Sequence, residues 1–352
     1  MSRQSWWARI GSGVALVGVV GLGLVALPGG AGAAPQLPPV SAEDLVTSVQ
    51  QVQPGPFNGT VALDNQLGLP AIPDVPQLAN GTSTARLWSG GDGRGRVSLP
   101  SGQGEKTLVS DGTTAWAYDS EERKATKSTS VPGANHPEAG LADPTKTAAD
   151  AIATLRQTSE VTVDGTAEVA GRPAYELVLA PKPTERTLLR EVRIAVDAEK
   201  RVPLRLTVLA NGSADPAFEL GFTDITFGPQ DAALFAFTPP PGTTVDDAPA
   251  HPEGGPQAER PQGARPTVVG DGWDTVLVTA LPTGGSAGAP TDRPGRGGEG
   301  APQLAQLGTP VSGPWGSGRL ISTAVAAAIV TDDGRVAVGA VPQQVLTEAL
   351  SK

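Results

Sequence analysis

Apolar and polar residues alternate along much of the chain, which is the period-two pattern of β-strands that bury one face. The alternation begins at Phe57 and predicts strands at 57–63, 85–88, 96–99, 106–110, 113–119, 123–128, 160–164, 174–179, 188–196, 204–209 and 218–227. Asn-Gly and Asp-Gly dipeptides, which favour tight hairpin turns, occur at 58–59, 80–81, 92–93, 111–112, 164–165 and 211–212. Short strands with such turns predict an antiparallel sheet rather than βαβ units.

Helical spacing replaces this alternation in two segments. Apolar residues recur at helical spacing over 45–52, and Ser41 with Asp44 resembles a capping box, so we expect a helix at 42–53. A second helix is expected at 144–158, where a proline stands at a favourable first position. Two helices are few for about ten strands. The apolar face of a curved sheet must be covered by helices or leave a cavity, and so few helices favour a cavity.

The C-terminal part of the chain predicts a second, smaller α+β unit at 268–352. Residues 246–267 are rich in Pro, Gly, Asp and Glu and nearly lack large apolar side chains, so they are predicted to form a disordered linker. Within the unit we expect a Gly/Pro-rich loop at 282–302, a helix at 343–350, and strands at 273–279, 319–330 and 335–341.

The N-terminus, 1–33, has the pattern of a secretory signal peptide. A basic segment with Arg3 precedes an apolar run at 10–27, and Ala31 and Ala33 fit a cleavage site. An uncleaved membrane anchor is the alternative, because the run has about the minimum length for spanning a bilayer. Both interpretations place the rest of the chain outside the cytosol, as a secreted or cell-envelope protein.

Composition narrows the possible functions. The 352 residues include no cysteine, which excludes disulfides and thiolate chemistry, and the net charge of −10 argues against nucleic acid as a partner. Abundant Ala, Gly, Pro and Arg indicate a high-GC, actinobacterial source. The two histidines, His136 and His251, lie far apart in loop-like sequence, and the G-x-S-x-G match at 284–288 lies in low-complexity sequence. We therefore expect no catalytic residues, no metal and no cofactor.

The apolar face of the sheet is the remaining candidate site. The expected lining or lid residues are Val61, Leu63, Leu69, Ile72, Leu87, Trp88, Trp116, Tyr118, Phe218 and Phe222. Leu69 and Ile72 belong to an apolar, proline-broken loop at 67–78, which is either a lid or a plain insertion that caps the core. The aromatic residues are alternatively ordinary core or cross-strand residues.

The order of these elements resembles the LolA-like and MucB/RseB-like superfamily of periplasmic proteins over about residues 41–245. The segment 111–119 is similar to that family's D-G-x-x-x-W-x-Y-D strand, and further likeness lies at 171–177, 193–197, 201–205, 222–225 and 235–240. The resemblance implies an α+β fold, an open antiparallel half-barrel wrapped around a few helices. It also implies a small C-terminal α+β unit like that of the RseB branch.

The resemblance further implies a non-enzymatic carrier or sensor that binds acyl chains of lipids or lipoproteins in its concave apolar face. The alternative that it implies is an RseB-like regulator, which binds the extracytoplasmic segment of a membrane-anchored anti-sigma factor. A hydrolase, the third possibility, requires a compact polar triad, and we find none in the sequence.

Overall fold

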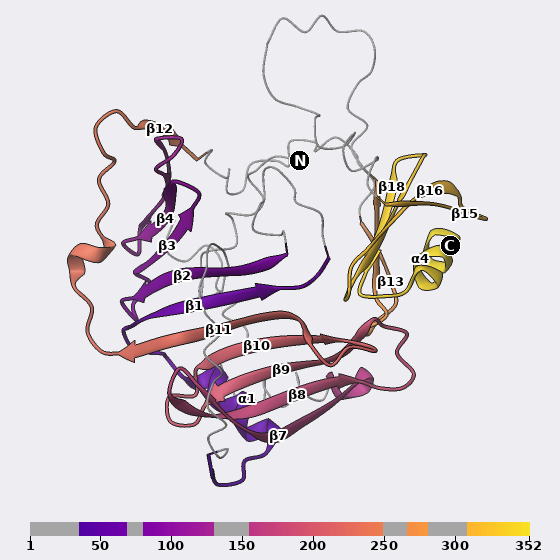
Figure 1. Cartoon of the computed structure of the whole chain (residues 1–352), viewed down its shortest axis with the longest axis horizontal. Helices are drawn as coiled ribbons and strands as arrows, with labels where there is room; N and C mark the ends of the chain where they lie inside the picture. Colours follow the sequence, from indigo (N-terminus) through magenta and orange to yellow (C-terminus); the bar gives the residue numbers. More distant parts are fainter. Residues whose placement is uncertain (1–34, 69–79, 130–154, 249–265, 281–307) are drawn as a thin grey trace, which may run out of the picture.

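The computed structural model describes residues 35–68, 80–129, 155–248, 266–280 and 308–352, which form two antiparallel-rich sheets (Figure 1). The larger sheet has twelve strands in the order β12-β6-β5-β4-β3-β2-β1-β11-β10-β9-β8-β7. Its edges, β12 and β7, do not pair with each other, so the sheet is open. The predicted α+β class with an open antiparallel sheet and few helices is confirmed.

Neighbouring strands in this sheet are consecutive in sequence at most positions. The first half consists of β1 (Phe57–Asn65), β2 (Gly81–Ser89), β3 (Gly95–Ser101), β4 (Gly104–Ser110), β5 (Thr114–Asp119) and β6 (Lys124–Thr129). The second half consists of β7 (Ser159–Val169), β8 (Arg172–Pro181), β9 (Leu189–Asp197), β10 (Pro203–Ala210) and β11 (Pro216–Phe227). The pairing of β1 with β11 joins the two halves.

The core of the larger sheet is centred on the β1–β11 pair. Phe57, Val61 and Leu63 alternate with half-buried neighbours along β1 and are nearly inaccessible to solvent. The ring of Phe222 packs edge-on against Phe57 with 6.1 Å between the ring centroids. A Cβ at Gly59 would lie 3.0 Å from the Phe222 ring and closer still to a backbone oxygen, so only glycine permits this approach.

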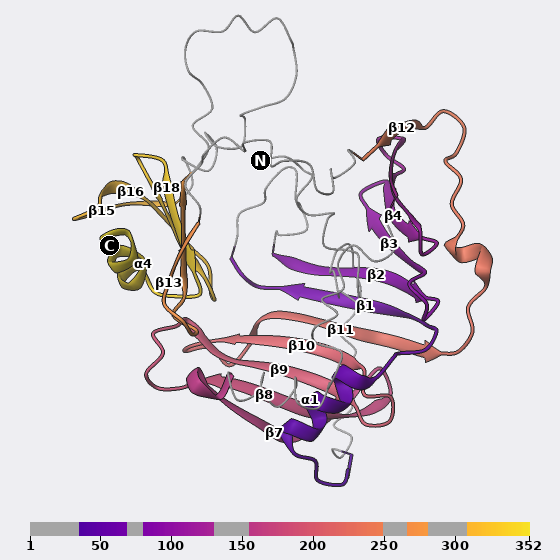
Figure 2. The same cartoon turned by 180° about the vertical axis from the view of Figure 1, so that it is seen from behind.

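Helix α1 (Ala42–Gln51) covers one end of the larger sheet, over β7, β8 and β9 (Figure 2). The Ser41 hydroxyl accepts a hydrogen bond from the backbone N–H of Asp44, which satisfies an unpaired donor of the first turn. Leu45 is fully buried against Tyr175 and neighbouring residues of β8 and β9. The predicted helix and its cap are confirmed, and the helix ends two residues earlier than expected.

Residues 229–243, which we call the strap, connect β11 to the far edge of the larger sheet. The strap contains the short 3-10 helix η4 (Ala232–Phe235), and it ends at β12 (Thr244–Asp247), which pairs in parallel with β6. Lys124 and Asp246 form an ion pair at 2.8 Å across this edge. The strap therefore crosses the outside of β3–β5, where Figure 1 shows it as the orange segment.

The smaller sheet has six strands in the order β13-β14-β18-β17-β16-β15. These strands are β13 (Thr267–Val269), β14 (Val276–Ala280), β15 (Thr309–Gly313), β16 (Gly316–Ser322), β17 (Ala327–Thr331) and β18 (Arg335–Gly339). Helix α4 (Gln343–Leu350) packs on one face, where Leu346 is fully buried with Val276 and Ile329. The expected C-terminal helix is therefore confirmed with its bounds.

Specific contacts join the two sheets at the loop between β8 and β9, at the start of β7 and after β1. The backbone N–H of Leu188 donates to the carbonyl of Ala340 at 2.8 Å, and the Leu188 side chain packs on the smaller core. The indole N–H of Trp273 donates to the hydroxyl of the buried Ser159 at 2.7 Å. On the other side, Ala324 N–H donates to the carbonyl of Leu67 at the end of β1.

Several local predictions differ from the structure. Residues 244–247, which overlap the predicted linker, form β12, because an edge strand needs only backbone hydrogen bonds and no apolar side chains. The expected strand at 319–330 is two strands, β16 and β17, joined by a turn in which Thr323 Oγ1 accepts from Ala326 N–H. Of the expected helix at 144–158, residues 155–158 are helical and the rest lie outside the described residues.

Two of the expected turn dipeptides lie inside strands. Asn58-Gly59 is part of β1, where the glycine makes room for Phe222. Asp164-Gly165 is part of β7, where a β-bulge lies between Val163 and Thr166 and Gly165 has φ of +89°. The division of the chain into domains stays a prediction, because the predicted boundaries fall partly outside the described residues.

Candidate functional site

The strand register assigns each residue of the larger sheet to one of two faces, because residues directly opposite on paired strands point to the same side. Helix α1 packs on Leu177 and its neighbours. Leu177 lies opposite Ile194, which lies opposite Leu206, and Leu206 lies opposite Leu220, which lies opposite Leu63. We call this side the α1 face. It carries the apolar core of β1 and β11.

The α1 face continues beyond β1 as an aliphatic row that crosses four strands. Leu87, Val97, Leu108 and Ala117 lie directly opposite one another on β2, β3, β4 and β5. All four side chains are half-buried, and Leu87 and Val97 pack against the core around Phe57 and Phe222. We call these four residues the aliphatic row. They form an apolar surface that is continuous with the core and partly open to solvent.

The face of the larger sheet that carries the buried side chains differs between β1 and β4. On β1 the buried residues are on the α1 face, whereas on β4 the buried residues, Thr107 and Val109, are on the opposite face. The cause is the strap, which covers the outer side of β3–β5 and buries its own Phe235 there. The α1 face of β3 and β4 is thus the less buried side of these strands, although Val97 and Leu108 on it are apolar.

Polar groups border the aliphatic row on both sides. The next row on the same face contains Leu99, Lys106, Asp119 and Lys124 in register. Lys106 and Asp119 form an ion pair at 3.3 Å. Burial raises the pKa of Asp119, but backbone N–H groups of Glu122 and Glu121 and the Lys106 ammonium lower it more, so the carboxylate stays charged. The row on the other side is Ser89, Gly95, Ser110 and Ala115.

The aromatic residues expected to line the site lie on the opposite face. Trp116 pairs with Val109, and Tyr118 pairs with Thr107, so both point away from the aliphatic row. Their rings each pack against Phe237 of the strap, at 5.6 Å between centroids. Trp88 lies on this same face, where the guanidinium of Arg86 stacks over its ring. The structure therefore does not bring these three residues together with Leu87.

The other expected site residues fall into three groups. Val61, Leu63 and Phe222 are buried in the core beneath the α1 face. Leu87 and Phe218 are partly buried on that face. Leu69 and Ile72 lie outside the described residues. The sequence analysis does not include Val97, Leu108 and Ala117 in the site. The alternation of their strands places them on one face, but it does not indicate which face stays uncovered.

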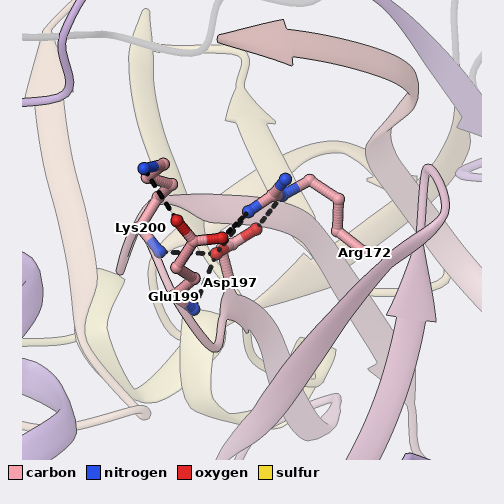
Figure 3. A network of polar contacts seen from close by, with 4 residues as sticks. All are labelled: Arg172, Asp197, Glu199 and Lys200. Atoms are coloured by element: carbon pink, nitrogen blue, oxygen red, sulfur yellow. Dashed lines mark hydrogen bonds and ion pairs between the residues drawn. The ribbon is translucent and has the colours of Figure 1, made fainter.

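A buried polar network holds the β9–β10 turn (Figure 3). The carboxylate of Asp197 is inaccessible to solvent and accepts hydrogen bonds from Arg172 and from the backbone N–H groups of Glu199 and Lys200. Burial raises the pKa of Asp197, but these hydrogen bonds lower it more, so it lies below the usual value. Arg172 also stacks over the ring of Phe227 at 5.0 Å, which links the turn to the end of β11.

Titratable groups elsewhere do not assemble a metal centre within the described part of the chain. Among those residues, no group of three or more His, Asp or Glu side chains is arranged to hold a metal ion. His136, His251 and the G-x-S-x-G segment lie outside the described residues. In the same described residues, no helix has the length and apolar character needed to cross a bilayer.

The packing of the strap is itself testable. Phe237→Ala removes the ring that both Trp116 and Tyr118 contact, so we expect a loss of about 1–2 kcal/mol, which is below the usual cost for a fully buried phenylalanine because Phe237 is half-buried. Amide hydrogen exchange of residues 244–248 should accelerate, because β12 follows the strap. Ala236→Gly, at an exposed strap position, is the control. Unchanged exchange in Phe237→Ala would contradict this account.

No family model matches the chain, and no curated protein matches its sequence. Among solved structures, the chain is similar to MucB of Pseudomonas aeruginosa in its complex with MucA, with 17% identity over 88% of this chain and 96% of that chain and a TM-score of 0.46. It is also similar to a LolA superfamily protein from Nitrosomonas europaea, with 10% identity over 56% and 99% of the two chains and a TM-score of 0.25. The likeness to both structures is one of fold alone.

Proposed function

We propose that this chain is a non-enzymatic binding protein of the cell envelope, a carrier or sensor that holds an acyl chain on the aliphatic row. The observation that supports the proposal is the row itself. Leu87, Val97, Leu108 and Ala117 are half-buried, aliphatic and in register, and the strap packs on the opposite side of β3–β5.

The dimensions and borders of the row fit an amphiphile. Neighbouring strands lie about 4.8 Å apart, so four strands span about 14 Å, which accommodates much of an extended acyl chain. Each methylene that leaves water contributes about 0.8 kcal/mol. The chain would lie on aliphatic side chains, and its head group would lie near Lys106, Asp119 and Lys124 at the border. No step in this function requires bond cleavage.

Native mass spectrometry of the protein purified from its own host without detergent tests the proposal. We expect an added mass that is released as lipid on denaturation. If the protein carries no added mass and takes up neither palmitate nor a triacylated lipopeptide, the proposal is wrong. That result would favour the regulator alternative, in which the ligand is the extracytoplasmic segment of a membrane-anchored protein.

The same measurement separates the two sources of an acyl chain. Uptake of palmitate or a phospholipid identifies a lipid carrier or lipid sensor. Uptake of the triacylated lipopeptide alone identifies a lipoprotein ligand, because the hydrocarbon is shared and only the peptide differs. Both outcomes keep the acyl chain as the recognised group.

A further inference from the structure

The smaller sheet carries a second apolar row on the face that α4 does not cover. Val268, Leu277, Val338, Ala328 and Ile321 lie directly opposite one another on β13, β14, β18, β17 and β16. Val268 is 62% exposed, and Leu277 and Val338 are each 38% exposed, although they are aliphatic. We call these five residues the free row. An exposed apolar row of this kind usually marks a binding surface.

The neighbouring row on this face has little charge. Arg319, Val330, Val336 and Thr279 lie in register beside the free row. Arg319 donates to the carbonyl of Gly308 at 3.1 Å, so its guanidinium is directed to the β15 side. The face therefore offers aliphatic contacts and no acidic group in these two rows. Hydrocarbon suits this surface better than a charged peptide.

The free row is turned inward. Figures 1 and 2 both show α4 on the side of the smaller sheet that faces away from β3 and β4, so the opposite side, with the free row, faces toward them. One end of the row is continuous with the contact between the sheets. Ala324, whose N–H donates to the carbonyl of Leu67 at 3.1 Å, lies in the turn between Ile321 and Ala328.

We propose that the free row is the second wall of the acyl-chain site, so that one lipid chain contacts both sheets. This inference rests on the proposed function and adds to it a role for the smaller sheet. The inward orientation of the row favours a slender occupant over a membrane surface or a second copy of the chain. A lipid is the source, because it brings only its chain and head group to the two apolar rows.

Photo-crosslinking of the full chain with a diazirine-bearing palmitate tests this arrangement. Mass spectrometry of the digested protein should find label in peptides that contain Val97 or Leu108 and in peptides that contain Leu277 or Val338. Label confined to the β2–β5 peptides would overturn the inference and leave the proposed function intact. Label in neither set of peptides, together with no bound palmitate, would contradict both the inference and the proposed function. If a photoreactive lipopeptide labelled both sets of peptides and the palmitate probe labelled neither, the ligand would be a lipoprotein rather than a lipid.

A substitution gives an independent test. Val338→Lys should weaken palmitate binding about tenfold, because an ammonium group would stand on the apolar wall. Val245→Lys is the matched control, since Val245 is 48% exposed but lies on β12. Val338→Thr preserves shape and strand preference, so it should fold normally and weaken binding by a smaller factor. Palmitate affinity equal to that of the unsubstituted protein in both Val338 variants would contradict the inference.

Discussion

Replacing Asp197 with alanine is expected to lower the free energy of unfolding by about 3–5 kcal/mol. The side chain is inaccessible to solvent and accepts hydrogen bonds from one guanidinium and two backbone N–H groups. Its removal leaves Arg172, whose side chain is only 23% exposed, without its main partner. The loss is a large fraction of the roughly 5–15 kcal/mol by which a typical domain is stable.

The pH dependence of this stabilisation has a definite sign. The pKa of Asp197 in the folded protein is lowered from its ordinary value, so the stabilisation is fully present above about pH 4, near the pKa of an unfolded aspartate. It is lost as the pH falls through the folded pKa. Asp197→Asn keeps a hydrogen-bond acceptor but carries no charge, so its unfolding free energy should depend less steeply on pH in acid.

Urea unfolding followed by circular dichroism measures both effects. Glu199→Ala is the matched control, because Glu199 is in the same turn and contacts the same arginine at 3.3 Å but is 68% exposed. Its unfolding midpoint should not change measurably, since an exposed ion pair contributes little. An Asp197→Ala midpoint equal to that of Glu199→Ala would show that the network does not stabilise the fold.

Local signals made much of the fold predictable. The Ser41–Asp44 cap and the spacing of apolar residues located α1, because capping and helical periodicity act within a few residues. The alternation of apolar residues located β1–β11 for the same reason. The C-terminal helix at 343–350 was also predicted with its observed bounds. Each of these elements is set by interactions among near neighbours in sequence.

Long-range contacts explain what the sequence did not reveal. Asn58-Gly59 has the form of a turn, but its glycine is required by the ring of Phe222, which is far away in sequence. β12 has few apolar residues, and it forms because the strap brings it to the free edge of β6, where Thr244 N–H donates to the carbonyl of Arg123. Neither contact leaves a periodic pattern in the segment concerned.

The candidate site shows the same limit. Alternation indicates that Trp116 and Leu108 lie on β-strands, but it does not indicate which face will be covered. That choice depends on the strap, whose Phe237 packs on Trp116 and Tyr118. Large aromatic residues were therefore assigned to the ligand site, whereas the structure uses them to attach the strap. The smaller aliphatic residues on the other side of the same strands form the candidate surface.

Replacing Leu108 with aspartate is expected to weaken palmitate binding by about 100-fold or more. A bound chain would cover this half-exposed position and remove water from the carboxylate, and an unpaired buried charge costs several kcal/mol. A factor of 100 in affinity corresponds to about 2.7 kcal/mol. In the unliganded protein the new carboxylate remains hydrated because the side chain is half-buried, so the protein should still fold.

Leu234→Asp provides the matched control for this experiment. Leu234 is also a half-buried leucine, but it lies in η4 of the strap, on the opposite side of β3. Its carbonyl accepts from Arg96 at 3.5 Å, so the position is close to the aliphatic row in the fold while facing away from it. Palmitate affinity, measured by titration calorimetry, should be unchanged in Leu234→Asp. Equal affinities of the two variants would mean that the aliphatic row does not hold the acyl chain, whereas loss in Leu108→Asp alone would place the chain on the α1 face of β2–β5.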